Sequence, residues 1–294
     1  MFKINELSTK WYFNAEKLWK NMNIDEKNLW NEVYTILSNP DLWAKWLVWI
    51  IYWVKTKFVE EFILNNSTEE QRNVVEEISM DMANTMKHIA TEVFPNAVQV
   101  VDRFHVMKNV LEDMSALISK VKTEIKKDYL EEQDQAKIER RKPNYKRFKN
   151  LENLLEIITR WRFQLLQRRK DWSDLQILRW ECFETIPLLQ NIVAMYKQIE
   201  RLFEIYDNNY SIENARIEFN KWFIFSSKLD FIIELQNTWR MIKNHFNRIL
   251  NYFQNRLTNW YAEWLNSRMQ RIISNLRWFK NQNYMIYRMI KIFG

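Results

Sequence analysis

The stretch EEISMDMANTMKHIATEVFPNAVQVVDRFHV, residues 76–106, decides the fold of this 294-residue chain. Its two ends, Glu76–Asp81 and Ala97–Phe104, are short apolar runs bounded by turn residues, so both are predicted strands. Between them lie four apolar residues at the spacing of one helix face, namely Met86, Ile89, Ala90 and Val93. Pro95 closes that helix. A strand, a helix and a strand in this order indicate an α/β core with some parallel pairing.

The residues before this stretch continue the alternation of strands and helices. Strands are predicted around Ile24 and at Val33–Ser38, and a fifth can form at Leu47–Val54. A helix is predicted over residues 67–78, because a Ser-Thr pair precedes acidic residues that fill its first turn. The fold class is therefore α/β in this part of the chain.

The second half of the chain has a different pattern. From His105 to about Leu257 the sequence indicates long amphipathic helices and no strand. Two further helices are predicted at Asn237–Asn255 and Asn259–Asn275. The whole chain is therefore expected to be dominated by helices.

The composition excludes several classes of protein. Hydrophobic residues make up 47% of the chain, which excludes a disordered protein. One cysteine excludes a disulfide framework, and one cysteine with three histidines excludes a Cys/His zinc site; nothing requires an oxidising compartment, so the cytoplasm is expected. The longest apolar run is too short to span a membrane, so no membrane partner is expected. The net charge of +7 favours an acidic partner, of which nucleic acid is the commonest.

Three acidic residues lie in contexts that suit catalysis. Asp25 ends a short apolar stretch, Asp81 ends a predicted strand just before a helix, and Glu263 lies early in a helix far along the chain. Carboxylates that meet at the carboxyl ends of strands repel one another, and a divalent cation is the usual relief. Each acid alone is more often a surface charge than a ligand. Likewise, Asp102 and His105 can simply be a helix cap and a hydrogen-bonded core histidine.

Three basic clusters with interleaved aromatic residues favour a surface that binds phosphates. The cluster at residues 137–149 contains Arg140, Arg141, Lys142, Lys146 and Arg147. A second cluster lies at residues 160–170. The third follows Glu263, contains no acid and includes Arg268, Arg271, Arg277 and Lys280. The alternative is that these charges are solvated helix faces, which is the usual role of a charged run.

These motifs resemble one family. The blocks NIDEKN (23–28), EEISMDMANTMKHIATEVFPNAVQVVDRFHVMK (76–108) and ILNYFQNRLTNWYAEWLNSRMQRI (249–272) are similar to bacterial insertion-sequence DDE transposases of the ISL-three family. The similarity runs from about Met22 to the C-terminus. It implies a ribonuclease-H-like catalytic core, a mixed sheet with flanking helices, interrupted by a large all-helical insertion.

The resemblance also implies an activity. Asp25, Asp81 and Glu263 take the positions of the catalytic and metal-binding carboxylates, which hold two Mg²⁺ ions, with Mn²⁺ as a substitute. The residues expected to support them are Asp102, Arg103, His105, Asn259 and Asn266. The implied enzyme is a metal-dependent polynucleotidyl transferase that cleaves and transfers the strands of an insertion sequence. Its expected partners are the element's ends, target DNA and further copies of itself, in the nucleoid of a bacterial cytoplasm.

The resemblance divides the chain into four parts. Residues 1–21 are a linker or a truncated N-terminal remnant, and residues 22–110 begin the catalytic core. Residues 111–240 are the helical insertion, and residues 241–294 contain the closing catalytic helix and a basic helix. Family members usually begin with a zinc module and a helix-turn-helix, and neither is visible here. The sequence thus indicates a truncated product or the catalytic half of a split system with a separate DNA-recognition subunit. The alternative function is an inactive remnant that only binds DNA.

One glycine and 15 tryptophans are unusual counts. The tryptophans in contexts where glycine or another small residue is expected are Trp30, Trp43, Trp46, Trp49, Trp53, Trp264 and Trp278. We hypothesise that most of them are glycines encoded by UGA; the alternative is a protein that is truly rich in tryptophan. Trp172 and Trp222 match aromatic positions of the family and are expected to be tryptophan. As tryptophans, residues 43–53 can place their indoles on one helix face, whereas glycines favour a turn and a strand.

Overall fold

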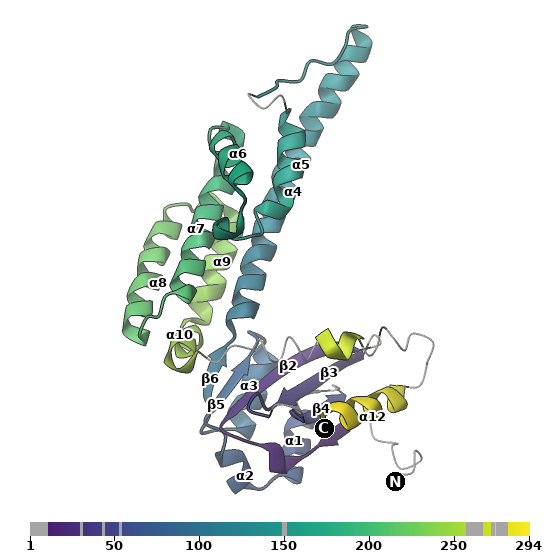
Figure 1. Cartoon of the computed structure of the whole chain (residues 1–294), viewed down its shortest axis with the longest axis vertical. Helices are drawn as coiled ribbons and strands as arrows, with labels where there is room; N and C mark the ends of the chain where they lie inside the picture. The colour runs from purple at the N-terminus through teal and green to yellow at the C-terminus, as the bar shows by residue number, and fades with distance from the viewer. Residues whose placement is uncertain are drawn as a thin grey trace. The chain divides into compact units, whose positions relative to one another are not determined.

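The computed structural model describes residues 11–29, 32–42, 45–52, 55–148, 152–256, 267–271, 274 and 282–294. The chain divides into two compact units, Met1–Val106 with His245–Gly294, and Met107–Asn244. The first unit contains a mixed β-sheet with flanking helices, and the second is built from helices (Figure 1). The expected fold class, a helix-dominated α/β fold with a ribonuclease-H-like core, is confirmed. No helix among the described residues is both long and apolar enough to cross a bilayer.

The sheet of the first unit has the strand order β1-β4-β3-β2-β5-β6. In this order the strands are Trp11–Phe13, Leu47–Tyr52, Glu32–Ser38, Asn21–Leu29, Glu77–Met80 and Val98–Val101. The first four pair antiparallel, whereas β5 runs parallel to β2 and β6 runs parallel to β5. The long strand β2 therefore joins an antiparallel half of the sheet to a parallel half.

Two hydrophobic clusters fix helices on the two faces of this sheet. Helices α1 (Thr56–Asn66) and α3 (Asn84–Val93) cover one face, where their buried residues pack against β2 and β5 (Figure 1). Helix α12 (Gln282–Phe293) covers the other face, where Met289 packs with Ile36 and its neighbours. The first unit is therefore a three-layered arrangement with the sheet in the middle.

The predicted strands form, but several element boundaries differ from prediction. The predicted strand at Ala97–Phe104 ends at Val101, because the Val106 N–H bonds the Asp102 carbonyl and opens helix α4 (Arg103–Ile138). The helix predicted over residues 67–78 is only α2 (Glu69–Asn73), since β5 begins four residues later.

Other elements also depart from the sequence prediction. The predicted helix Asn237–Asn255 is divided at His245 into α9 (Ile233–Asn244) and α10 (Phe246–Asn255). Strand β1 and helix α1 were not predicted, so part of the segment 1–21, expected to be a linker or remnant, belongs to the sheet. Of the helix predicted at 259–275, residues 267–271 and 274 are described, and they are helical.

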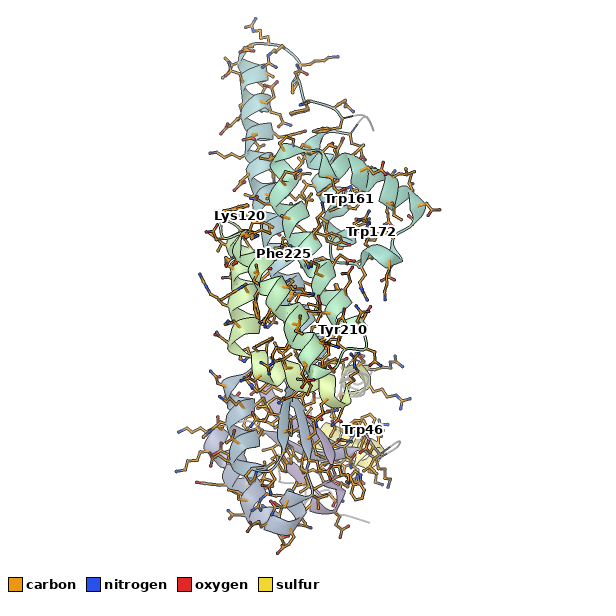
Figure 2. The ribbon with its side chains drawn as sticks, turned by 90° about the vertical axis from the view of Figure 1, so that its left-hand side faces the viewer. Trp46, Lys120, Trp161, Trp172, Tyr210 and Phe225 are labelled. Carbon is orange, nitrogen blue, oxygen red and sulfur yellow. The ribbon has the colours of Figure 1, made fainter. Side chains whose placement is uncertain are left out.

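The second unit has an aromatic core. Its helices are the part of α4 from Met107, α5 (Leu154–Gln164), α6 (Asp174–Glu184), α7 (Gln190–Asp207), α8 (Ile212–Ser227) and α9. Between α5, α6 and α7, ring centroids lie 5.2–5.7 Å apart among Trp161, Trp172, Trp180, Phe183 and Tyr196 (Figure 2). The Trp222 indole N–H donates to the Gln198 carbonyl at 3.0 Å. Such burial of large rings accounts for the compactness of this unit.

The tryptophan-rich segment forms a strand and not a helix. Trp49 lies on β4 and is fully buried, and its ring lies parallel to that of Phe94 with centroids 6.1 Å apart. Trp46 precedes β4 and packs on Phe293. Trp172, expected to be a true tryptophan, donates its indole N–H to the Gln164 carbonyl, whereas the buried Trp49 indole N–H finds no acceptor among the described residues. An unsatisfied buried donor costs about 1–3 kcal/mol.

The UGA hypothesis predicts a mass for one peptide of the natural protein. Trypsin releases residues 46–55 between Lys45 and Lys55, and this peptide holds Trp46, Trp49 and Trp53. We expect mass spectrometry to find glycine at these positions and tryptophan at Trp172. Tryptophan at all three positions of the peptide, or at residue 264, would end the hypothesis.

Candidate active site

The parallel strands place three aspartates in one row. The pairs that set the register are Asn23 with Ser79, and Ser79 with Val100. Two residues further along each strand stand Asp25, Asp81 and Asp102. The Asp102 N–H donates to the Met80 carbonyl at 3.0 Å, so the register continues past the last strand pair. Because side chains alternate along a strand, the three aspartates belong to the same face at the carboxyl ends of β5 and β6.

His105 connects two aspartates of this row. Its Nδ1 lies 3.1 Å from Asp102 Oδ2, and its Nε2 lies 3.8 Å from Asp25 Oδ1. Both carboxylates are buried. Burial lowers the pKa of His105, but the hydrogen bond from Asp102 and the charges of Asp25, Asp102 and Asp81 outweigh it, so the pKa is raised. A protonated imidazole thus offsets part of the negative charge of the row.

Asp81 and Glu26 are positioned by helix α3. The Asp81 Oδ1 accepts the backbone N–H of Ala83 at 2.8 Å, which fixes the turn between β5 and the helix. The Glu26 Oε1 accepts the Thr85 hydroxyl at 3.2 Å. Burial raises the pKa of the Glu26 carboxyl, and the charges of Asp81 and Asp25 raise it further, against the lowering effect of Thr85. Several carboxylates therefore share one electrostatic environment.

Helix α10 is fixed to the parallel strands by two asparagines. The Asn251 side chain donates to the Gln99 carbonyl at 2.9 Å, and the Asn255 side chain donates to Glu77 Oε2 at 2.7 Å. The helix lies along β6, as its label in Figure 1 shows. These bonds set where the first turn of the helix meets the acidic row.

The first turn of α10 brings two basic groups that sequence reasoning missed. Arg248 Nη2 lies 2.6 Å from His245 Nδ1, and Arg248 Nη1 lies 3.9 Å from Met80 Sδ. The signal that could have found Arg248 is its place on an otherwise apolar helix face, one residue before the buried Ile249. A charge inside an apolar stripe is unusual unless it has a buried partner or a function.

The third predicted carboxylate, Glu263, lies outside the described residues, as do Asn259, Asn266, Arg277 and Lys280. Met269, which follows Glu263 closely in the sequence, packs in one cluster with Ile36. Ile36 pairs with Asp25, so the two side chains project on the same face of the sheet. Within the described ranges, no group of three or more His, Cys, Asp or Glu residues is arranged to hold a metal ion.

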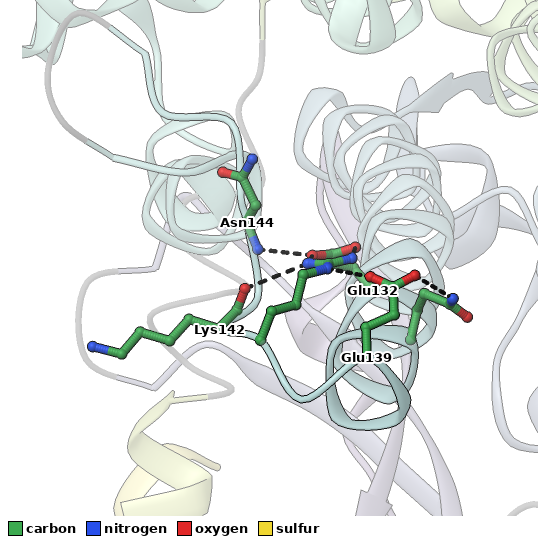
Figure 3. A network of polar contacts seen from close by, with 6 residues as sticks. Glu132, Glu139, Lys142 and Asn144 are labelled. Carbon is green, nitrogen blue, oxygen red and sulfur yellow. Dashed lines mark hydrogen bonds and ion pairs between the residues drawn. The ribbon is translucent and has the colours of Figure 1, made fainter.

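The first basic cluster lies where α4 ends. Arg140 adopts a left-handed conformation (φ 52°) just past the helix, and Arg141 turns back onto α4. The Arg141 guanidinium bonds both carboxylate oxygens of Glu132, at 2.5 and 3.1 Å, and one of Glu139 at 2.5 Å (Figure 3). These bonds lower the pKa of Glu132 to about 2. Arg141 is thus committed to holding the turn in place.

Other predicted DNA-binding residues differ from Arg141. The Lys142 side chain extends away from this network (Figure 3), and Lys146 is also exposed. Arg147 forms an isolated β-bridge with Asn153. In the first unit, Arg268 and Arg271 are exposed. Arg103, predicted to support the catalytic acids, is the first residue of α4, next to Asp102.

The environment of His105 predicts its titration. In the metal-free protein we expect NMR to give His105 a pKa above the ordinary value of about 6.5, and Asp102→Asn to lower it. Because the folded-state pKa is raised, protonated His105 contributes its full stability below the unfolded-state pKa. That contribution is lost as the pH rises through the folded-state pKa. His105→Gln identifies the signal. A wild-type pKa at or below 6.5 would contradict the arrangement.

The turn after α4 predicts different effects for its basic residues. We expect Lys142→Met with Lys146→Met to reduce the salt dependence of DNA binding by a slope of about one per lost phosphate contact. Arg141→Met removes the bonds to Glu132 and Glu139, so we expect increased hydrogen exchange in residues 130–146 and an unchanged slope. Filter binding at several salt concentrations and hydrogen exchange measure the two effects. A lower slope for Arg141→Met alone would assign the phosphate contact to Arg141 instead.

Comparison with known proteins identifies the family. The model of the ISL-three DDE family, described as a transposase, matches residues 22–289. No curated protein and no solved structure gives a significant match. The matched range includes Asp25, Asp81, Asp102 and His105, which the fold brings together. It covers most of the chain. This chain therefore belongs to the ISL-three family of DDE transposases.

Proposed function

We propose that the chain is a transposase catalytic domain that cleaves and joins DNA with Mg²⁺ held by Asp25, Asp81 and Glu263. The observation that carries the proposal is the placement of Asp25 and Asp81 at equivalent positions of two adjacent parallel strands. Membership of a transposase family supplies the reaction class. DNA is the proposed partner, in line with the net charge of +7.

The residues present suit a hard divalent cation. Asp25 and Asp81 offer carboxylate oxygens, which Mg²⁺ and Mn²⁺ prefer to nitrogen or sulfur. The raised pKa of Glu26 reports the repulsion of its carboxyl by Asp81 and Asp25 on top of burial. A cation between these groups would relieve that repulsion. When bound, two such ions supply an activated water or 3′-hydroxyl and stabilise the departing 3′-oxygen in an in-line displacement.

The remaining residues of the site position these carboxylates. The Ala83 N–H holds Asp81 Oδ1, and His105 lies between Asp102 and Asp25. Because Asp102 is buried and bonded to His105, it orients the imidazole and does not itself face a ligand. A carboxylate held by fixed donors loses little conformational entropy when it binds a ligand. Asp102 and His105 are therefore proposed as positioning residues.

Replacing Asp81 tests the proposal. Asp81→Asn removes a negative ligand and keeps the side-chain oxygen that accepts from Ala83, so the fold should persist. We expect Mg²⁺-dependent cleavage of insertion-sequence DNA to fall about a thousandfold, or about 4 kcal/mol in activation free energy. Metal-free DNA binding should be unchanged. Gel assays of cleavage and binding measure both effects.

The matched control is Asp128→Asn on the exposed surface of α4, which should leave both properties as in the wild type. Cleavage by Asp81→Asn at the wild-type rate would sink the assignment of Asp81. A wild-type chain that binds DNA but never cleaves it would favour the alternative, an inactive DNA-binding remnant.

A further inference from the structure

Arg248 is a half-buried cation beside the acidic row. Its guanidinium touches His245 Nδ1 and Met80 Sδ, and it makes no ion pair with any residue in the described ranges. Met80 directly precedes Asp81 in the sequence. Withdrawing an arginine from water without a carboxylate partner is costly, so the position of Arg248 calls for an anion.

His245 orients this guanidinium. Arginine has only donors, so His245 Nδ1 must accept the bond from Arg248 Nη2, and its proton then lies on Nε2. Burial lowers the pKa of His245, and the charges of Arg248 and Lys87 lower it further, against the charge of Asp81. A neutral histidine can therefore hold the arginine without repelling it. Bonds from Asn251 and Asn255 to the parallel strands fix the helix that carries both residues.

The charges around Arg248 match a phosphate group and not a second carboxylate of the protein. Burial lowers the pKa of Arg248, and the charge of Asp81 acts in the opposite direction, so the two groups are electrostatically coupled. Lys87, from helix α3, is a second cation that acts on His245. The planar guanidinium presents several donors in a fork that fits two phosphate oxygens. The other Nη and Nε donors remain for such a ligand.

We propose that Arg248, oriented by His245, binds a backbone phosphate of the DNA strand that is cleaved at Asp81. This inference rests on the proposed function and adds a residue that holds the substrate. In this role Arg248 brings the phosphate against carboxylates that would otherwise repel it. Helix α10 is then part of the substrate-binding surface as well as a support for β6.

The test uses the full chain with Arg248→Met, Arg248→Lys and the exposed control Lys57→Met on helix α1, which removes the same charge. Binding of a mixed-sequence DNA duplex is measured without divalent metal at several salt concentrations, and nicking is measured with Mg²⁺. We expect Arg248→Met to reduce the salt slope by about one and the nicking rate about 10- to 100-fold. Arg248→Lys should keep the slope and part of the rate, and Lys57→Met should behave as the wild type.

Three results would overturn the inference. The first is a wild-type salt slope for Arg248→Met. The second is an equal loss of melting temperature and activity in the Met and Lys variants with an unchanged slope, which would assign Arg248 to packing. The third is faster nicking by Arg248→Met at low Mg²⁺, which would make Arg248 a mere counter-ion of Asp81. If the wild type does not nick DNA, the proposed function fails, while the salt slope still decides the role of Arg248.

Discussion

The parallel pairing of β2, β5 and β6 is the constraint on which the site depends. Its register brings Asp25, Asp81 and Asp102 to equivalent positions, although they are far apart in the sequence. The buried residues of α1, α3 and α12 hold this sheet from both faces. A slip of one residue in either parallel pair would send a carboxylate to the opposite face. The hydrophobic packing of the first unit thus serves directly to position charge.

The cost of gathering like charges is met by groups of different kinds. His105 is bonded to Asp102 and faces Asp25, and the Ala83 N–H holds Asp81. Arg248 approaches from a separate helix and has no carboxylate partner of its own among the described residues. The site is therefore incomplete in charge, which is the state expected of a surface that receives both metal ions and an anionic backbone.

The sequence predicted the parts of this account that depend on local pattern. The strand–helix–strand unit around residues 76–106 follows from periodicity, and the resemblance to a family singled out Asp25 and Asp81. The three-residue strand β1 carries no periodicity, and helix α1 follows a tryptophan-rich stretch whose pattern is ambiguous. Arg248 could not be placed because its neighbours come from tertiary packing of α10 on β6. Arg141 was grouped with DNA-binding residues because its bonds to Glu132 depend on the turn at Arg140.

The central claim is that carboxylates on adjacent parallel strands form one metal site. Electron paramagnetic resonance of Mn²⁺ added to the full chain tests it most directly, because free and bound Mn²⁺ give distinguishable signals. The account predicts that the wild type binds Mn²⁺, that Mg²⁺ competes for the same site, and that Asp25→Asn and Asp81→Asn each weaken binding. Binding of Mn²⁺ by both variants as tightly as by the wild type would contradict it.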